Sequence, residues 1–310
     1  MSTSVPQPLD TKRRTEAQEY FRTLQVDITT ELESIDGKNK FSEDPWSYDA
    51  ASPGPVRTGG GLTKVLENGA VFEKAGVNFS AVESALTEKL AARMSVNPQK
   101  VFATGISLVL HPFSPMVPSV HMNLRYLELE SGDAWFGGGI DLTPFYIRAE
   151  DIKKYHTALK RVCDAYNPDW YMRFKNSCDQ YFYLSHRNET RGVGGLFFDY
   201  ERENPDLMFR FVQELGRNFI PIYKPIVERR RHEVWGRKEK VWQEIRRGRY
   251  AEFNLLYDRG TLFGLETEGR TESILISLPP HVRWGYDYQP EPGTREYDLL
   301  EVLHHPRSWL

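Results

Sequence analysis

Apolar positions recur along this chain with two different periods, and each period predicts a type of element. Near the N-terminus they are spaced by three or four residues, at Ala17, Phe21, Leu24, Ile28, Leu32 and Ile35. This spacing predicts an amphipathic helix with Gly37 as its C-cap. The same spacing predicts helices over 152–163, 170–184, 206–235, 237–248 and 296–303. Pro221 and Pro225 are expected to bend the longest of these.

Alternation of apolar and polar residues marks the predicted strands. The two clearest are Val101–Leu110 and Ser119–Glu130, which a proline-bearing turn separates. Shorter strands are expected within 65–82, 133–136, 192–200, 251–257, 261–266 and 273–278, and a flexible loop over 51–61. Because strands lie towards both ends and helices are grouped between them, the pattern predicts an α+β fold around an antiparallel sheet. We expect a flexible tail over residues 1–14 and a single domain over 15–310.

Composition and charge exclude several classes of protein. The 310 residues carry a formal net charge of −3, which gives no bulk attraction to nucleic acid or to an anionic membrane. No apolar run approaches the ~18 residues of a membrane span, and the N-terminus lacks the apolar core of a secretory signal. Cys163 and Cys178 form no disulfide framework and cannot make a zinc site alone. We therefore expect a cytoplasmic protein with no transmembrane segment and no nucleic-acid partner.

The strand-like run from Val120 to Tyr126 has two chemically different sides. Strand side chains alternate between faces, so His121, Asn123 and Arg125 point one way and the apolar residues between them the other. The polar side presents an imidazole, an amide and a guanidinium, each about 7 Å from the next. Such a row suits a large anionic substrate that needs both binding and proton transfer. An ordinary solvent-facing side of an antiparallel strand is an equally good interpretation.

Two neighbouring segments offer residues that would extend this row. Ser107 and His111 share one side of the preceding strand and join the row if the two strands pair, whereas turn chemistry before Pro112 is the alternative. Asp141 follows three glycines and lies between apolar residues, which predicts partial desolvation of its carboxylate. That carboxylate would accept hydrogen bonds from N–H groups of a ligand, or act as a base if its pKa is raised. A turn or helix-cap role for Asp141 is the alternative.

The remaining candidates are an arginine in a turn and two histidines. Arg270, in Glu268-Gly269-Arg270, is expected in a hairpin turn, where it either binds a carboxylate or lies on the surface. His156 lies on the apolar stripe of its helix, and His186 follows Phe182 by one turn. Both are interpreted as hydrogen-bonded core or interface histidines. No pair of histidines has the spacing of a metal site, so we expect no metal.

Long segments of the chain resemble the oxygen-dependent coproporphyrinogen III oxidases of haem biosynthesis. The resemblance lies in NGAVFEKAGVNFS (68–80), SLVLHPFSPMVPSVHMNLRY (107–126), WFGGGIDLTPFY (135–146), YFYLSHRNETRGVGGLFFDY (181–200), residues 246–288 and LEVLHHPRSWL (300–310). It covers about residues 15–310. It implies a large antiparallel sheet flanked by helices on both faces, in a homodimer.

The resemblance also implies a reaction: oxidative decarboxylation of two propionates of coproporphyrinogen III to vinyl groups, giving protoporphyrinogen IX, CO2 and hydrogen peroxide. Molecular oxygen would be the co-substrate, with no haem, flavin, nicotinamide or metal cofactor. His121 would be the proton donor, and Asp141 would engage pyrrole N–H groups. Substrate contacts are expected from Ser107, Asn123, Arg125, Glu268, Gly269 and Arg270. Many members of the family have Gly-Gly-Arg or Gly-Ser-Arg where this chain has Glu268-Gly269-Arg270.

The residue chemistry suits a substrate with four carboxylates around an electron-rich ring. Arg125 and Arg270 would hold carboxylates, and the pyrroles would give their electrons directly to O2. Our hypothesis is that Asp141 helps to deprotonate a pyrrole nitrogen while His121 is the acid–base partner. Two alternatives stay open: a tetrapyrrole-binding protein without catalysis, and a metal-dependent oxygenase that uses the histidines at positions 111, 121, 156 and 186.

Overall fold

The computed structural model describes residues 11–48, 57–93, 96–266 and 268–310. Residues 1–10 of the expected tail and residues 51–56 of the expected loop lie outside the described residues. The first helix, α1 (Thr11–Asp36), includes residues 11–14, which the sequence pattern left in the tail. Its predicted apolar stripe is buried, and Gly37 ends it with a φ of +74° and a hydrogen bond from its N–H to the Glu33 carbonyl. The predicted helix and its cap are confirmed.

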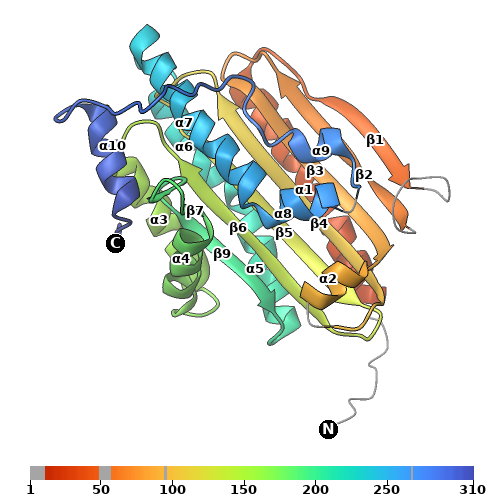
Figure 1. The fold of residues 1–310 in the computed structure, drawn as a ribbon. Coiled ribbons are helices and arrows are strands. Elements are labelled where there is room, and N and C mark those ends of the chain that lie inside the picture. The colour runs from red at the N-terminus through yellow and green to blue at the C-terminus, as the bar shows by residue number, and fades with distance from the viewer. Residues whose placement is uncertain (1–10, 49–56, 94–95, 267) are drawn as a thin grey trace.

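A seven-stranded antiparallel sheet forms the centre of the molecule (Figure 1). Its strands, in spatial order, are β1 (Ser42–Tyr48), β2 (Arg57–Glu67), β3 (Phe72–Ala85), β4 (Lys100–Pro112), β5 (Ser119–Leu129), β6 (Ala134–Thr143) and β9 (Gly195–Glu201). Each of the first five pairs with the next strand along the chain, and β6 pairs with β9. A separate two-stranded ribbon joins β7 (Tyr183–Leu184) and β8 (Glu189–Thr190). The predicted α+β fold around a large antiparallel sheet is confirmed.

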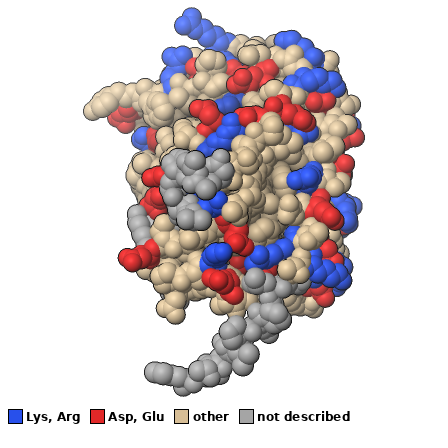
Figure 2. Space-filling model, turned by 90° about the vertical axis from the view of Figure 1, so that its right-hand side faces the viewer, with Lys and Arg blue, Asp and Glu red and all other residues tan. Residues whose placement is uncertain are grey.

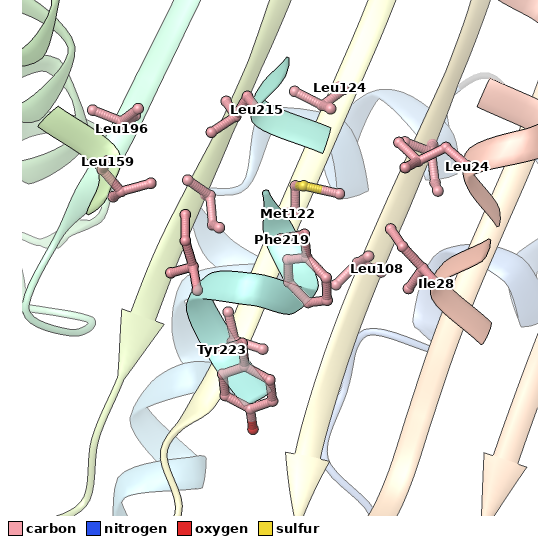
Figure 3. Close-up of a cluster of buried hydrophobic side chains, with 14 of the residues drawn as sticks. Leu24, Ile28, Leu108, Met122, Leu124, Leu159, Leu196, Leu215, Phe219 and Tyr223 are labelled. Carbon is pink, nitrogen blue, oxygen red and sulfur yellow. The ribbon is translucent and has the colours of Figure 1, made fainter. Parts of the chain in front are cut away.

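One face of the sheet carries the main hydrophobic core. Leu108, Met122 and Leu124 point from β4 and β5 towards side chains of the helices behind the sheet (Figure 3). Those helices are α1, α3 (Ala149–Asp164), α5 (Pro205–Arg217) and α6 (Phe219–Arg230), and α4 (Trp170–Tyr181) packs along the edge strand β9. The apolar side of the 120–126 run is therefore the core side, which leaves its polar side on the opposite face.

Three later helices lie in front of that opposite face, drawn in blue in Figure 1: α7 (Arg237–Leu256), α8 (Arg259–Glu266) and α9 (Thr271–Leu275). Two buried ion pairs hold α7, Arg247 with Glu73 at 2.6 Å and Arg246 with Glu189 at 2.8 Å. The short helix α2 (Glu88–Arg93) and the C-terminal α10 (Arg295–His304) complete the fold. Among the described residues, no helix is long and apolar enough to cross a membrane.

The predicted strands at 251–257, 261–266 and 273–278 are wrong, because these residues lie in α7, α8 and α9 and the following turn. The hairpin expected at 268–270 is likewise a turn between two helices. Short apolar runs do not distinguish a strand from a helix by periodicity alone. Several apolar side chains of these runs, Leu255, Leu256, Phe263 and Leu265, are exposed. The runs therefore have a β-type composition without the packing that would make them strands.

Three other boundaries differ from the sequence prediction. The strand expected at 133–136 continues through the three glycines to Thr143, since its neighbours on both sides supply ladder hydrogen bonds. Arg57–Gly61, expected in a loop, begin β2. The helix expected over 206–235 is divided at Asn218 into α5 and α6. Pro221 falls in the first turn of α6, where proline is tolerated, so the break precedes it.

Candidate active site

The register of β4, β5 and β6 brings most of the predicted site residues onto one face of the sheet. Ser107 lies opposite Asn123, and His121 lies opposite Asp141. Directly opposed residues of an antiparallel pair point to the same side. These four residues and Arg125 therefore share the face in front of which α7, α8 and α9 lie. His121, Asn123, Arg125 and Ser107 are partly exposed, so solvent reaches this polar face.

His121 is held by a buried carboxylate. Its Nδ1 lies 2.8 Å from Asp141 Oδ1, and the edge of its ring meets Phe182 at 5.9 Å between centroids. An ionised carboxylate can only accept, so Nδ1 must carry the hydrogen. Nε2 is then the nitrogen that can exchange a proton. Nε2 has no hydrogen-bond partner within the described part of the chain, and the imidazole is 18% exposed.

Asp141 is bound from its other side by Arg191. Arg191 Nη2 donates to both carboxylate oxygens, at 2.8 and 2.9 Å, and both side chains are only 2% exposed. The guanidinium also donates to Asn254 Oδ1 at 2.8 Å. It stacks against three aromatic rings, those of Phe182, Tyr250 and Phe253, at 4.1 to 4.9 Å from their centroids. Asn254, Arg191, Asp141 and His121 thus form one hydrogen-bonded chain, called here the relay.

The relay corrects the predicted roles of Asp141. The residue lies within strand β6, so it is neither a turn nor a helix-cap residue. Burial raises the pKa of its carboxyl group, but Arg191 and the hydrogen bond from His121 outweigh burial and lower the pKa below the ordinary 3.8. A carboxylate with a lowered pKa is a poor base, and its oxygens are already engaged. The raised pKa and the role as a base are therefore not supported.

Arg125 is oriented by two acceptors from different strands. Its Nη1 donates to Asn123 Oδ1 at 2.9 Å, and its Nη2 lies 2.9 Å from Asp199 Oδ2 on β9. Strand β6 runs between β5 and β9, and Gly137 is the residue over which this ion pair passes. A Cβ at Gly137 would lie 2.6 Å from Asp199 Oδ1 and 2.9 Å from Arg125 Nε. The absence of a side chain there is what allows the close approach.

The other two candidates on β4 differ from each other. Ser107 is partly exposed on the polar face, where its hydroxyl has no hydrogen-bond partner among the described residues. His111 is fully buried, with Nδ1 3.2 Å from Ser119 Oγ and Nε2 2.9 Å from the Ser277 carbonyl. Burial and the nearby Arg247 lower its pKa well below 6.5. His111 is therefore a neutral histidine that ties the 275–278 turn to the sheet.

The 268–270 segment lies at the opposite end of the polar face. Arg270 pairs with Asp44 on β1, and its Nη1 is buried without a hydrogen-bond partner among the described residues. Glu268 is exposed, has a positive φ of 55°, and accepts a hydrogen bond from Arg57 through its carbonyl. Gly269 packs closely against Gly264 and Ile274. Arg270 is the member of this segment whose charged group is available to a ligand.

The remaining histidines are separate from one another. His156 is buried between the Val193 carbonyl and the Tyr171 hydroxyl, and burial lowers its pKa to about 4, as expected for a core histidine. His186 is exposed and bonds Tyr257 and Glu252. Within the described ranges, no group of three or more His, Cys, Asp or Glu side chains could hold a metal ion. The absence of a metal cofactor stays a prediction.

Three residues of the site were not predicted from the sequence: Arg191, Asn254 and Asp199. Arg191 stands in a glycine-rich segment without a period, and Asn254 in a run that was predicted to be a strand. Asp199 carried a usable signal, since Phe197 and Asp199 alternate with the buried Leu196 and Phe198. The partners of Arg191 come from three separate elements, which no local pattern reveals.

Comparison with known proteins identifies the family of this chain. Residues 16–309 match the family model described as coproporphyrinogen III oxidase. The protein named coproporphyrinogen-III oxidase 1, chloroplastic, from Arabidopsis thaliana is 44% identical over 325 residues, covering 99% of this chain and 82% of the relative. The oxygen-dependent coproporphyrinogen-III oxidase, chloroplastic, of Glycine max is 44% identical over 97% of this chain and 80% of its own length. This chain belongs to the coproporphyrinogen III oxidase family.

Proposed function

We propose that this chain is an oxidoreductase that converts two propionates of coproporphyrinogen III to vinyl groups, with O2 as the acceptor. The observation that carries the proposal is the relay, which presents His121 Nε2 on the same sheet face as Arg125. A proton-exchanging group and a fixed cation thus lie together in a member of this family. The product is protoporphyrinogen IX, and the reaction is a step of haem biosynthesis.

Each round removes one carboxylate and one electron pair. The propionate carbon attached to the pyrrole loses a hydrogen with its electron pair, and the carboxylate leaves as CO2, so a vinyl group forms. O2 takes the electron pair, that hydrogen and one further proton to become hydrogen peroxide. We propose that the electron pair passes from the propionate to O2 through the electron-rich pyrrole and that no haem, flavin, nicotinamide or metal takes part.

The residues of the polar face would have separate roles in binding and proton transfer. Arg125 binds a propionate carboxylate, and its fixed cation suits the planar geometry of that group. His121 exchanges the proton through Nε2, while Asp141 fixes the tautomer and the ring orientation. Arg191 keeps Asp141 ionised. Ser107 and Asn123 offer polar contacts beside Arg125, and Gly269 and Arg270 border the far end, with Glu268 pointing to solvent.

The test is an assay of coproporphyrinogen III turnover with metal-stripped protein, in air and without O2. Protoporphyrin fluorescence and oxygen uptake are the readouts. We expect turnover in air, uptake of one O2 per CO2 released, and none without O2. Binding without uptake would favour a non-catalytic tetrapyrrole carrier, and recovery only after metal addition would favour a metal-dependent oxygenase.

A matched pair of variants tests the role of His121. Asn in His121→Asn can still donate to Asp141 but has no Nε2, so we expect a loss of kcat on the order of 10²–10⁴-fold, the typical contribution of a general acid–base group. His232→Asn, at an exposed position on another side of the fold, is the control. Equal activity of the two variants would remove His121 from the mechanism.

The chain is also proposed to act in the cytoplasm and as a homodimer. The names of the two plant relatives contain the word chloroplastic, so cell fractionation is the measurement for the first proposal. Sedimentation equilibrium of the purified chain is the measurement for the second. A monomer at micromolar concentration would contradict the homodimer.

A further inference from the structure

A row of polar side chains crosses five strands on the polar face. Asp44 lies opposite Thr63, Thr63 opposite Asn78, Asn78 opposite Ser107, and Ser107 opposite Asn123. Since opposed residues share a face, the five side chains form one line from β1 to β5. Four steps between strands, at about 4.8 Å each, make the line about 19 Å long.

An arginine stands at each end of this row, and each is paired with a carboxylate of the chain. At the β5 end, Arg125 meets Asp199. At the β1 end, Arg270 meets Asp44. The arginines are equally accessible, at 30% and 29% exposure. A carboxylate ligand that reached either end would therefore meet a cation that already has a partner.

The two partners are held very differently. Asp199 is 17% exposed, accepts a second hydrogen bond from the Tyr200 N–H at 3.0 Å, and lies across Gly137. Asp44 is 49% exposed and has no bond besides that to Arg270 among the described residues. The side of the molecule on which β1 lies shows basic and acidic side chains interspersed, not a field of one sign (Figure 2). The pairing of Arg270 with Asp44 is thus a local contact that a ligand could replace.

We propose that Asp44 is a specificity-determining residue that stands in for a substrate carboxylate on Arg270, whereas Asp199 stays in place and orients Arg125. A half-exposed carboxylate returns to water at little cost when it is displaced. Arg270 Nη1, buried and unpartnered, gives the incoming carboxylate a second donor that Asp44 does not use. This inference rests on the proposed function, because it takes the ligand to be a tetrapyrrole with carboxylates on its rim.

Replacement of Asp44 by a ligand carboxylate on Arg270 would select against small acids. A tethered carboxylate competes at an effective concentration in the millimolar range or above. A small carboxylic acid in the cell would bind Arg270 through its carboxylates alone, so it competes poorly with the carboxylate of Asp44. In the middle of the row, Thr63 and Asn78 are already bonded to Ser273 of α9. A polycarboxylate macrocycle adds contacts with Ser107 and Asn123 at the β5 end and a second carboxylate at Arg125, so the macrocycle displaces Asp44 where a small acid does not.

The test compares three variants with opposite expected effects. Asp44→Asn should bind coproporphyrin III, a fluorescent tetracarboxylate probe, about fivefold more tightly, and succinate should inhibit it more strongly by a similar factor. Asp199→Asn should instead lose about tenfold or more in kcat/KM. Glu43→Gln is the matched control, because Glu43 is the neighbouring residue on β1, pairs with Lys64 on the other face, and is as exposed as Asp44 or more so.

Binding of the probe is measured by fluorescence and is independent of turnover. Failure of the proposed reaction would therefore leave the probe-binding comparison intact, although the kcat/KM and succinate readouts need turnover. Weaker or unchanged probe binding by Asp44→Asn would overturn the proposal, since Asp44 would then position Arg270 or leave it unaffected. The gain should disappear in Asp44→Asn combined with Arg270→Gln. A gain that survives in this double variant would place the effect elsewhere and would also overturn the proposal.

Discussion

Replacement of Arg191 by methionine should reverse the sign of the pH dependence that Asp141 gives to folding stability. In the native chain the pKa of Asp141 is lowered. The contribution of Asp141 to folding stability is therefore fully present above its pKa in the unfolded state, about 3.8, and is lost as the pH falls through its pKa in the folded state. In Arg191→Met burial acts without the guanidinium and raises the pKa. The contribution is then present below the unfolded pKa and is lost as the pH rises.

The magnitude follows from the geometry of the buried pair. Two hydrogen bonds of 2.8 and 2.9 Å join side chains that are 2% exposed, so removal of one partner leaves a buried charge. The expected cost at pH 8 is about 3–5 kcal/mol for Arg191→Met and the same for Asp141→Asn. His121 remains as a partner in Arg191→Met, which favours the lower end of this range. With both replacements together, the cost should fall short of the sum by about 2–3 kcal/mol.

The assay is urea unfolding, followed by tryptophan fluorescence and far-ultraviolet circular dichroism at pH 5 and pH 8. The Arg191→Met deficit relative to the native chain should be larger at pH 8. A deficit that is equal at both values, or energies that add within about 0.5 kcal/mol in the double variant, would show that the two groups are not coupled. Asp133→Asn, which breaks the exposed pair with Arg202, is the control and should change stability by less than about 1 kcal/mol.

Three further predictions concern single positions. Gly137→Ala should separate Arg125 from Asp199 and lower kcat/KM about 10–100-fold, while the unfolding free energy changes by only about 1 kcal/mol because the clashing atoms are side-chain ends; an unchanged kcat/KM would contradict this. His156→Gln should flatten the pH dependence of stability between pH 6.5 and 4, because the native imidazole stays neutral there while the unfolded one binds a proton, a difference on the order of 3 kcal/mol; titration of the unfolding free energy measures it, and an equal slope would refute it. Leu124→Ala, in the fully buried core, should cost about 2–5 kcal/mol in urea unfolding, and a loss below about 1 kcal/mol would show that the site collapses around the smaller residue.

The sequence predicted the structure correctly where the spacing of apolar residues and the adjacent element along the chain determine it. The 120–126 strand, its two faces and its pairing with Ser107 follow from alternation and a short turn. The first helix follows from six apolar positions and a glycine. In these regions local propensity and final packing agree.

The sequence was less informative where a partner comes from far along the chain. Arg191 lies 50 residues after Asp141, and nothing near either residue indicates the other. The lowered pKa of Asp141 depends on that contact, so the sequence alone suggested the opposite shift. The C-terminal helices were predicted as strands for a different reason, because a short apolar run has the same local pattern in either type of element.

The order of strands has a consequence for how the molecule is made. From β1 to β6 each strand pairs with the one synthesised just before it, so the emerging chain can add strands to a growing meander one at a time. Contacts that are near in sequence form early and at low entropic cost. Two carboxylates of the sheet pair with arginines that are synthesised later. Asp141 pairs with Arg191, which precedes β9, and Glu73 pairs with Arg247 on α7. Until Arg191 and Arg247 are synthesised, the two carboxylates of the sheet therefore lack their arginine partners, and the segment from α7 to α9 covers the polar face last.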